Sequence, residues 1–410
     1  MTLDFRPPKE NRWILRLSQA VLPMAMRRVR GIVSISLSKT DWSHLESLRG
    51  SRAILSANHP TTSDPLIAMY LSWRLGEPFN YMACRELFHG PWGWTIQRLG
   101  AYSIHRGLPD RQSLRMTRHL LAERDRKVVI FPEGETYEQN DSLIPFQQGV
   151  VQIGYGALDD LQKAGREAVL PLLPIAVKYC CVSDARPAID TGLHALEGAL
   201  GLSPASGEGF YARLRCVGER VLARMELEFR IRPVPGAELS ERIAAAKEHV
   251  LDRVARQGGV ARPSHLPLSE QMRALFNAVY EFADEIADAP DEYGRRQHAR
   301  RVTAARPLLQ DLRRLQNFLM VTDGYVAERM SGERFLDVIS RLEREVLGKV
   351  RHRVRREAVV RIAPPIDLGQ RYEAYRQRKR ETVAEVTAEV EGCVRALLTE
   401  LGALGMPIEG

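Results

Sequence analysis

Short β-rich runs alternate with helical stretches along the first half of this chain, and few folds accommodate that order. The β-rich runs cover residues 52–56, 101–104, 128–131, 169–177 and 225–231, and the helical stretches include residues 65–75, 112–124 and 150–163. Strands that alternate with helices form a sheet that carries helices on its faces. The sequence therefore predicts an α/β fold.

Two polar runs follow two of these expected strands. The first is Asn58-His59-Pro60-Thr61-Thr62-Ser63-Asp64, and the second is Phe131-Pro132-Glu133-Gly134. Loops at strand ends are the usual place for a site in an open α/β sheet. We expect His59 and Glu133 to lie on such loops.

The pair His59 and Asp64 has the chemistry needed to activate an alcohol. An imidazole is well suited, near neutral pH, to take the proton of an attacking hydroxyl. A carboxylate that accepts the proton of the other ring nitrogen fixes the tautomer and stabilises the imidazolium. The nucleophile pattern Gly-x-Ser-x-Gly is absent, so we expect the acceptor hydroxyl to attack an acyl thioester directly, without an acyl-enzyme.

Four blocks in order resemble the glycerolipid acyltransferases of the lysophosphatidate acyltransferase superfamily. They are the His59 and Asp64 run, the segment from Gly100 to Arg106, the Phe131 to Gly134 run, and a proline-rich strand at 170–175. The resemblance covers roughly residues 45–235. It implies a mixed sheet flanked by helices and transfer of a fatty acyl group from acyl-CoA or acyl carrier protein to the hydroxyl of a lysophospholipid or related glycerolipid.

The same resemblance implies a role for each matched residue. His59 is similar to the family's general base and Asp64 to its partner, the two catalytic positions. Arg106 matches an arginine that holds the acceptor's phosphate, a task that suits guanidinium geometry. The substrate-binding positions are Asn58, Arg106, Glu133 and Gly134.

The sequence departs from the family pattern at two places. The third block usually continues Thr-Arg-Ser, whereas here it continues Glu135-Thr136-Tyr137. Farther on, Gln147 and Gln148 replace two lysines of a Pro-Phe-Lys-Lys-Gly segment. Basic contacts are lost at both places, so a less anionic acceptor is plausible.

Each matched residue also has a purely structural interpretation. Asp64 precedes Pro65 and an apolar run, which is typical of a helix N-cap. His59 alone would be a hydrogen-bonded loop histidine, Arg106 a solvated loop charge, and Glu133 the cap of a turn. The four ordered blocks favour the functional interpretation of all four residues.

Two other functions compete with acyl transfer. A lipid-binding or scaffold protein could retain the fold without turnover, as the altered third block suggests. A metal-dependent hydrolase using His59 and Asp64 needs more clustered ligands than the sequence offers, so we expect no metal site. The run Gly154-Tyr155-Gly156 lacks the third glycine of a dinucleotide fingerprint, and we expect no cofactor besides the acyl thioester co-substrate.

Composition and charge indicate where the protein resides and what it binds. The chain has 410 residues, a net charge of +8 and a pI near 9.3, which suggests an anionic partner. For a lipid enzyme the expected partner is a negative membrane surface rather than nucleic acid. No apolar stretch of about 18 residues and no signal peptide occur, and the five cysteines are scattered without Cys-x-x-Cys pairs. We expect a cytoplasmic protein bound peripherally to the inner face of the membrane.

The sequence predicts three regions along the chain. Residues 1–40 are expected to form an amphipathic helical segment, broken at Pro23, that lies either at a membrane interface or on its own domain. Residues 41–258 would form the acyltransferase domain. Residues 259–410 are expected to form a mainly helical domain of unknown role, with a break or kink at Pro307 and a strand near 358–365 that echoes 225–233.

Overall fold

The computed structural model describes residues 5–104, 110–134, 136, 138–203, 209–284, 291–319, 323–350 and 354–408. The chain forms two compact units. The first, here called the sheet unit, comprises Phe5–Ser183 and Val354–Gly405. The second, the helical unit, comprises the described residues between 184 and 350 together with residues 406–408.

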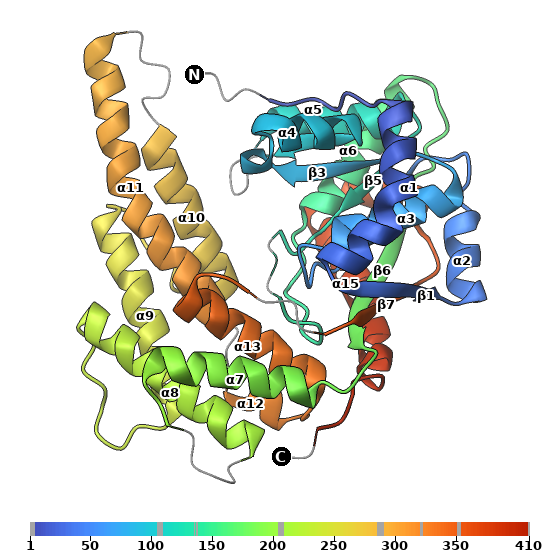
Figure 1. Ribbon diagram of the computed structural model, residues 1–410. Coiled ribbons are helices and arrows are strands. Elements are labelled where there is room, and N and C mark those ends of the chain that lie inside the picture. Colours follow the sequence, from blue (N-terminus) through green and yellow to red (C-terminus); the bar gives the residue numbers. More distant parts are fainter. Residues whose placement is uncertain are drawn as a thin grey trace. The chain divides into compact units, whose positions relative to one another are not determined.

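One 8-stranded sheet organises the sheet unit, with the order β1-β7-β6-β2-β5-β3-β4 and with β8 paired to β6 (Figure 1). Its strands are β1 Ile32–Leu37, β2 Ala53–Ala57, β3 Phe79–Cys84, β4 Ala101–Ile104, β5 Lys127–Ile130, β6 Pro171–Cys181, β7 Arg356–Ile362 and β8 Ile366–Asp367. The five strands β6, β2, β5, β3 and β4 run parallel, while β7 is antiparallel to β6 and β1 runs parallel to β7. The mixed sheet expected from the sequence is confirmed.

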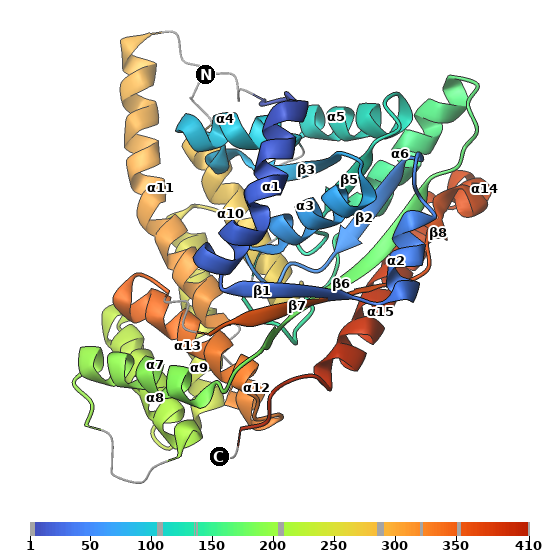
Figure 2. The ribbon, with the colours of Figure 1, turned by 45° about the vertical axis from the view of Figure 1, so that its right-hand side comes forward.

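Helices cover both faces of this sheet (Figure 2). The helices of the unit are α1 Arg12–Val29, α2 Lys39–Glu46, α3 Asp64–Leu75, α4 Gly90–Arg98, α5 Arg111–Ala122, α6 Gly149–Lys163, α14 Tyr372–Gln377 and α15 Lys379–Gly402, with short 3-10 turns at Arg85–Leu87 and Leu368–Arg371. One buried core joins the sheet to α5, α6 and α15, and a second core joins it to α1, α2 and α3. Burying both faces explains why the central strand β2 is apolar along most of its length.

The register of the central strands fixes which ends meet. Leu55 of β2 pairs with Val129 of β5 on one side and with Leu173 of β6 on the other. On the outer side of β6, Cys181 pairs with Arg356, the first residue of β7. The carboxyl ends of β2, β5 and β6 therefore share one edge of the sheet with the amino end of β7.

The helical unit is built from α7 Arg186–Leu200, α8 Phe210–Phe229, α9 Leu239–Gln257, α10 Leu268–Asp284, α11 Glu292–Leu319, α12 Asp323–Ala327 and α13 Gly332–Leu347. Helix α7 packs on α8 and α13, and α11 packs on α9 and α10. Buried ion pairs join some of these helices, as between Arg213 of α8 and Glu197 of α7 at 2.8 Å.

The strand expected at 225–231 is wrong, because these residues end helix α8. Met225, Leu227 and Phe229 alternate as in a strand, but Leu227 is 82% exposed while Met225 and Phe229 are buried. The buried residues Val217, Val221 and Met225 follow one another at intervals of four, and this helical period prevails. The echo of 358–365 is therefore no structural repeat.

Both prolines expected to break helices lie within continuous helices, Pro23 in α1 and Pro307 in α11. The helical stretch expected over residues 1–40 ends at Val29, and Ile32–Leu37 forms strand β1. Strand β3 is also not expected from the sequence.

The compact units divide the chain at other positions than the expected ranges 1–40, 41–258 and 259–410. Strand β7 pairs with both β1 and β6, so the chain returns to the sheet after residue 354. Residues 184–258, expected in the acyltransferase domain, lie in the helical unit instead.

Candidate functional site

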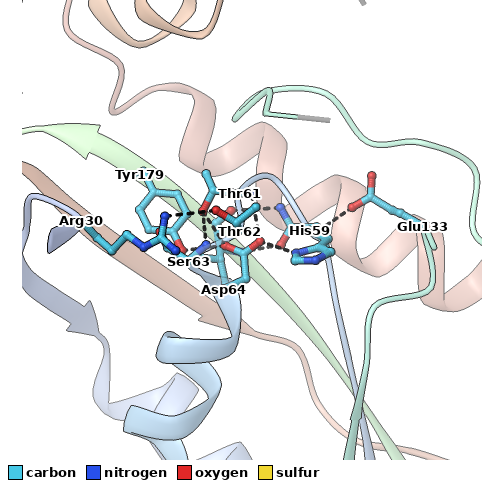
Figure 3. Close-up of polar contacts among 10 residues, drawn as sticks. Arg30, His59, Thr61, Thr62, Ser63, Asp64, Glu133 and Tyr179 are labelled. Atoms are coloured by element: carbon cyan, nitrogen blue, oxygen red, sulfur yellow. Dashed lines mark hydrogen bonds and ion pairs between the residues drawn. The ribbon is translucent and has the colours of Figure 1, made fainter. Parts of the chain in front are cut away.

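The sheet topology brings the two sequence motifs together. Strands β6, β2 and β5 are parallel neighbours, so the segments that follow them emerge at one edge. His59 follows β2, Glu133 follows β5, and Tyr179 lies near the end of β6. Figure 3 shows Tyr179 and His59 on either side of Asp64, the first residue of α3, and Glu133 beyond His59.

His59 and Asp64 form a close, buried pair. Nδ1 of His59 lies 2.6 Å from Oδ2 of Asp64, and the Asp64 residue is only 2% exposed. Because a carboxylate can only accept, the Nδ1 proton must be donated to Asp64. Nε2 is then the nitrogen with the lone pair, as a general base requires.

Asp64 holds this position through three further hydrogen bonds. Its carboxylate accepts from the Tyr179 hydroxyl at 2.6 Å, from the Thr61 amide at 2.9 Å, and from the Thr61 hydroxyl at 3.3 Å. The N-cap of α3 is Ser63, not Asp64. The helix-capping interpretation of Asp64 is therefore wrong.

The ring of His59 is also held by packing. It stacks on Phe131 with ring centroids 4.1 Å apart and an interplanar angle of 15°. Phe131 is the first residue of the second motif and follows β5. The two motifs thus meet through an aromatic contact as well as through hydrogen bonds.

Glu133 supports the loop that carries His59. Its Oε1 accepts the His59 amide at 2.6 Å and its Oε2 accepts the Ile144 amide at 3.0 Å. Burial raises the pKa of Glu133 to about 7, against the lowering effect of these two amides. Glu133 therefore acts here as a bridge between two loops rather than as the cap of one turn.

Gly134 adopts a backbone conformation that favours glycine, with φ at +74°. Its amide donates to the Phe131 carbonyl at 3.1 Å within the turn. A Cβ atom at this position would lie 1.8 Å from Nε2 of Gln147, which donates to the Glu133 carbonyl at 3.2 Å. One of the two glutamines that replace the family's lysines thus packs directly on the motif.

Asn58 is buried between β2 and β6, and the substrate contact expected for it stays a prediction. Its Nδ2 donates to the Val177 carbonyl at 2.9 Å, and its Oδ1 accepts the Val177 amide at 2.7 Å. The residue is 1% exposed. The amide therefore extends the pairing of β2 with β6 beyond the last residue of β2.

Two residues near the site carry no signal in the sequence. Tyr179 reaches Asp64 only because β6 pairs with β2. Glu391 of α15 accepts the Phe146 amide at 2.9 Å, two residues beyond the amide that binds Glu133. Non-local sheet pairing and helix packing place both side chains.

The remaining predicted residue, Arg106, lies outside the described residues, so its phosphate role stays a prediction. Among the residues that the structure describes, no cluster of three or more His, Cys, Asp or Glu side chains could hold a metal ion. Over the same residues, no helix is both long and apolar enough to cross a membrane.

Comparison with known proteins bears on the part of the chain that carries the site. Residues 39–178 match the family model described as Acyltransferase. This range contains His59, Asp64, Glu133 and Gly134, so the resemblance found from the motifs is confirmed there. A search of curated proteins finds no match to the chain.

Proposed function

This chain carries a domain of the acyltransferase family, and we propose that the domain moves a fatty acyl group from an acyl thioester to the hydroxyl of a glycerolipid acceptor. The observation that carries the proposal is the 2.6 Å contact between His59 Nδ1 and Asp64 inside the matched range. A buried carboxylate on Nδ1 leaves Nε2 as the proton acceptor, which is what this chemistry needs.

In the proposed reaction the acceptor hydroxyl loses its proton to Nε2 of His59 as its oxygen attacks the thioester carbonyl carbon. The C–S bond then breaks, the ester is released, and the thiolate leaves with the proton held by His59. Asp64 stabilises the imidazolium between these steps. Acyl-CoA and acyl carrier protein are the proposed donors.

The test is a transfer assay with purified protein, labelled palmitoyl-CoA or palmitoyl-acyl carrier protein, and a panel of acceptors. The panel includes lysophosphatidate, other lysophospholipids, glycerol 3-phosphate and monoacylglycerol. We expect transfer by the wild type and a loss of about a hundredfold to ten-thousandfold in kcat for His59→Ala and for Asp64→Asn.

A matched control is His119→Ala, because His119 is a solvent-accessible histidine that pairs with Glu123 on the surface of α5. An exposed pair of this kind contributes little to stability, and we expect unchanged transfer. Absence of transfer from both thioesters would instead favour the lipid-binding or scaffold function.

We also propose that the sheet unit binds an anionic membrane surface through α1. Trp13 and Leu17 are 77% and 67% exposed, and Val21 and Met24 continue the same exposed stripe at helical spacing. The opposite face of α1 is buried in the sheet unit through Leu22 and its neighbours. Arginines on α1 accompany the stripe, namely Arg12, Arg16, Arg27 and Arg28.

An exposed apolar stripe beside cationic side chains is typical of helices that lie in a membrane interface. Two further exposed tryptophans, Trp92 and Trp94, lie on α4, which packs against α1. Arg98 stacks on Trp94 at 3.7 Å, so charge and aromatic surface are combined there as well. This surface would bring the site to lipid acceptors.

Vesicle co-sedimentation tests this surface. We expect the wild type to bind vesicles that contain phosphatidylglycerol better than neutral phosphatidylcholine vesicles, and Trp13→Ser with Leu17→Ser to reduce binding about tenfold. Leu227→Ser is the matched control, because Leu227 is a leucine of the helical unit that is even more exposed than Leu17. Equal binding of all variants would contradict the proposal.

A further inference from the structure

Two arginines outside the range matched by the family model lie at the edge of the sheet that carries His59. Arg30 caps the carboxyl end of α1, two residues before β1, and Arg356 is the first residue of β7. The Arg356 amide donates to the Gly31 carbonyl at 2.8 Å, so the start of β7 lies beside the segment that joins Arg30 to β1. Since β7 is antiparallel to β6, its first residue pairs with Cys181, two residues beyond Tyr179.

Both guanidinium groups border the hydrogen-bond network of Asp64. Nη1 of Arg30 donates to the Thr62 hydroxyl at 3.3 Å, and Figure 3 shows Arg30 on the side of Asp64 away from His59. The guanidinium of Arg356 lies 5.3 Å from the centroid of the Tyr179 ring. The turn from Thr61 to Asp64 therefore has an imidazole on one side and cationic groups on the other.

No carboxylate among the described residues neutralises the positive charge of these arginines. Both side chains are half-buried, and within the described ranges neither Arg30 nor Arg356 forms an ion pair with a carboxylate. The carboxylate of Asp64 already accepts from His59, Tyr179 and Thr61.

In the helical unit, two arginines that leave bulk solvent meet acids. Arg213 binds Glu197, and Arg314 binds Glu345 at 2.6 Å. A half-buried cation without a counter-ion is costly, and a guanidinium offers parallel donors that match the oxygens of a phosphate. Two neighbouring guanidinium groups without an acid among the described residues are therefore an arrangement suited to an external anion.

We propose that Arg30 and Arg356 form an anion-binding subsite that holds a phosphate group of one substrate of the acyl transfer. The subsite rests on the proposed function for its role, but not for its ability to bind phosphate. It would supply basic contacts that Gln147 and Gln148 do not. The phosphate belongs either to the headgroup of the acceptor lipid or to the coenzyme A part of the donor.

Binding measurements test the subsite without turnover. Isothermal titration calorimetry would compare glycerol 3-phosphate and coenzyme A on the wild type, on Arg30→Gln with Arg356→Gln, and on Arg124→Gln. Arg124 is an exposed arginine after α5, before the amino end of β5, and serves as the matched control. We expect the double variant to weaken binding of one probe by about tenfold or more, and the control to match the wild type.

Kinetics then identify the source of the phosphate. If the acceptor headgroup occupies the subsite, the double variant raises KM for lysophosphatidate but not for monoacylglycerol. If the donor occupies it, KM rises for palmitoyl-CoA but not for a palmitoyl thioester of N-acetylcysteamine. A third outcome is that the wild type transfers no acyl group and still binds a probe more tightly than the double variant does. That result would support the subsite and refute the proposed function.

Two results would overturn the subsite. One is binding of both probes by the folded double variant with the affinity of the wild type. The other is the absence of measurable binding of either probe to the wild type. Circular dichroism of the double variant verifies that it is folded, and the single variants Arg30→Gln and Arg356→Gln replace it if it is not.

Discussion

The hydroxyl of Tyr179 lies 2.6 Å from Oδ1 of Asp64 and donates a hydrogen bond to it. The other oxygen of the same carboxylate accepts from His59, so Tyr179 fixes the orientation of the group that orients the base. Burial and the Asp64 charge raise the pKa of Tyr179 well above its ordinary value. The phenol therefore stays a donor over the whole range in which the enzyme would work.

Tyr179→Phe should lower kcat by about tenfold with little change in KM, because a hydrogen bond to a charged group contributes about 1.5–3 kcal/mol. The aromatic ring that packs in the core is retained, so the protein should fold. Tyr155→Phe is the matched control, since Tyr155 is equally buried and its hydroxyl has no hydrogen-bond partner among the described residues. Equal kcat values for the two variants in the transfer assay would show that Tyr179 does not position Asp64.

The sequence predicts the site residues that lie close together in the chain. It does not predict those that reach the site through contacts between distant segments. His59 and Asp64 are separated by one turn, so their spacing alone indicates that they can meet. Glu133 is brought to His59 by pairing of β2 with β5. The sequence indicates that both residues follow strands, but not that these two strands are neighbours. Tyr179 needs the pairing of β2 with β6, and nothing in its own neighbourhood indicates that role.

The same distinction applies to the fold. Expected strands at 52–56, 101–104, 128–131 and 169–177 all occur, because each apolar run is bounded by clear breaks. Strand β1 follows an arginine-rich helix so closely that the two are inseparable in the sequence. Its partner β7 is more than 300 residues away in the chain, as the pairing of Ile32 with Arg356 shows, and no local signal specifies such a contact.

Glu133 should make stability depend on pH. The unfolded carboxyl releases its proton near pH 4.5 and the folded one near pH 7, so between these values the folded state binds more protons. The free energy of unfolding should then fall as pH rises through this interval, by about 3 kcal/mol in all. Urea unfolding of the wild type at several pH values measures the slope.

The comparison variant for this slope is Glu133→Gln, which cannot ionise. Its amide offers one acceptor oxygen for two backbone donors, so it should be less stable by about 1–3 kcal/mol at low pH but should lose less stability as pH rises. Glu167→Gln changes an exposed glutamate and should keep the wild-type slope. A slope in Glu133→Gln as steep as that of the wild type would assign the pH dependence to another group.

Gly134→Ala should lower stability and kcat by more than the strain of a positive φ angle accounts for. Gly134 and Gly165 have similar φ angles of +74° and +65°, but only at Gly134 would a Cβ meet another group, the amide of Gln147. Gly165→Ala should cost about 1 kcal/mol of stability and leave transfer intact. Gly134→Ala should cost more and also lower kcat, because Gln147 must leave the Glu133 carbonyl. Chemical denaturation and the transfer assay measure the two effects, and identical results for both variants would exclude this role of Gln147.

Glu391 should act on the site from helix α15, outside the range matched by the family model. It accepts the Phe146 amide at 2.9 Å and pairs with Arg395 at 2.7 Å. The bond to Phe146 holds the loop whose Ile144 amide binds Glu133. Glu391→Ala leaves a partly buried amide without its acceptor, a loss of about 1–3 kcal/mol of stability, and should reduce kcat about tenfold as the loop shifts.

Glu391→Gln keeps an acceptor oxygen and should retain most activity. The control Glu389→Ala removes only a surface pair with Arg371 and should behave as the wild type. If Glu391→Gln loses as much activity as Glu391→Ala, the negative charge of Glu391 matters rather than its hydrogen bond to Phe146.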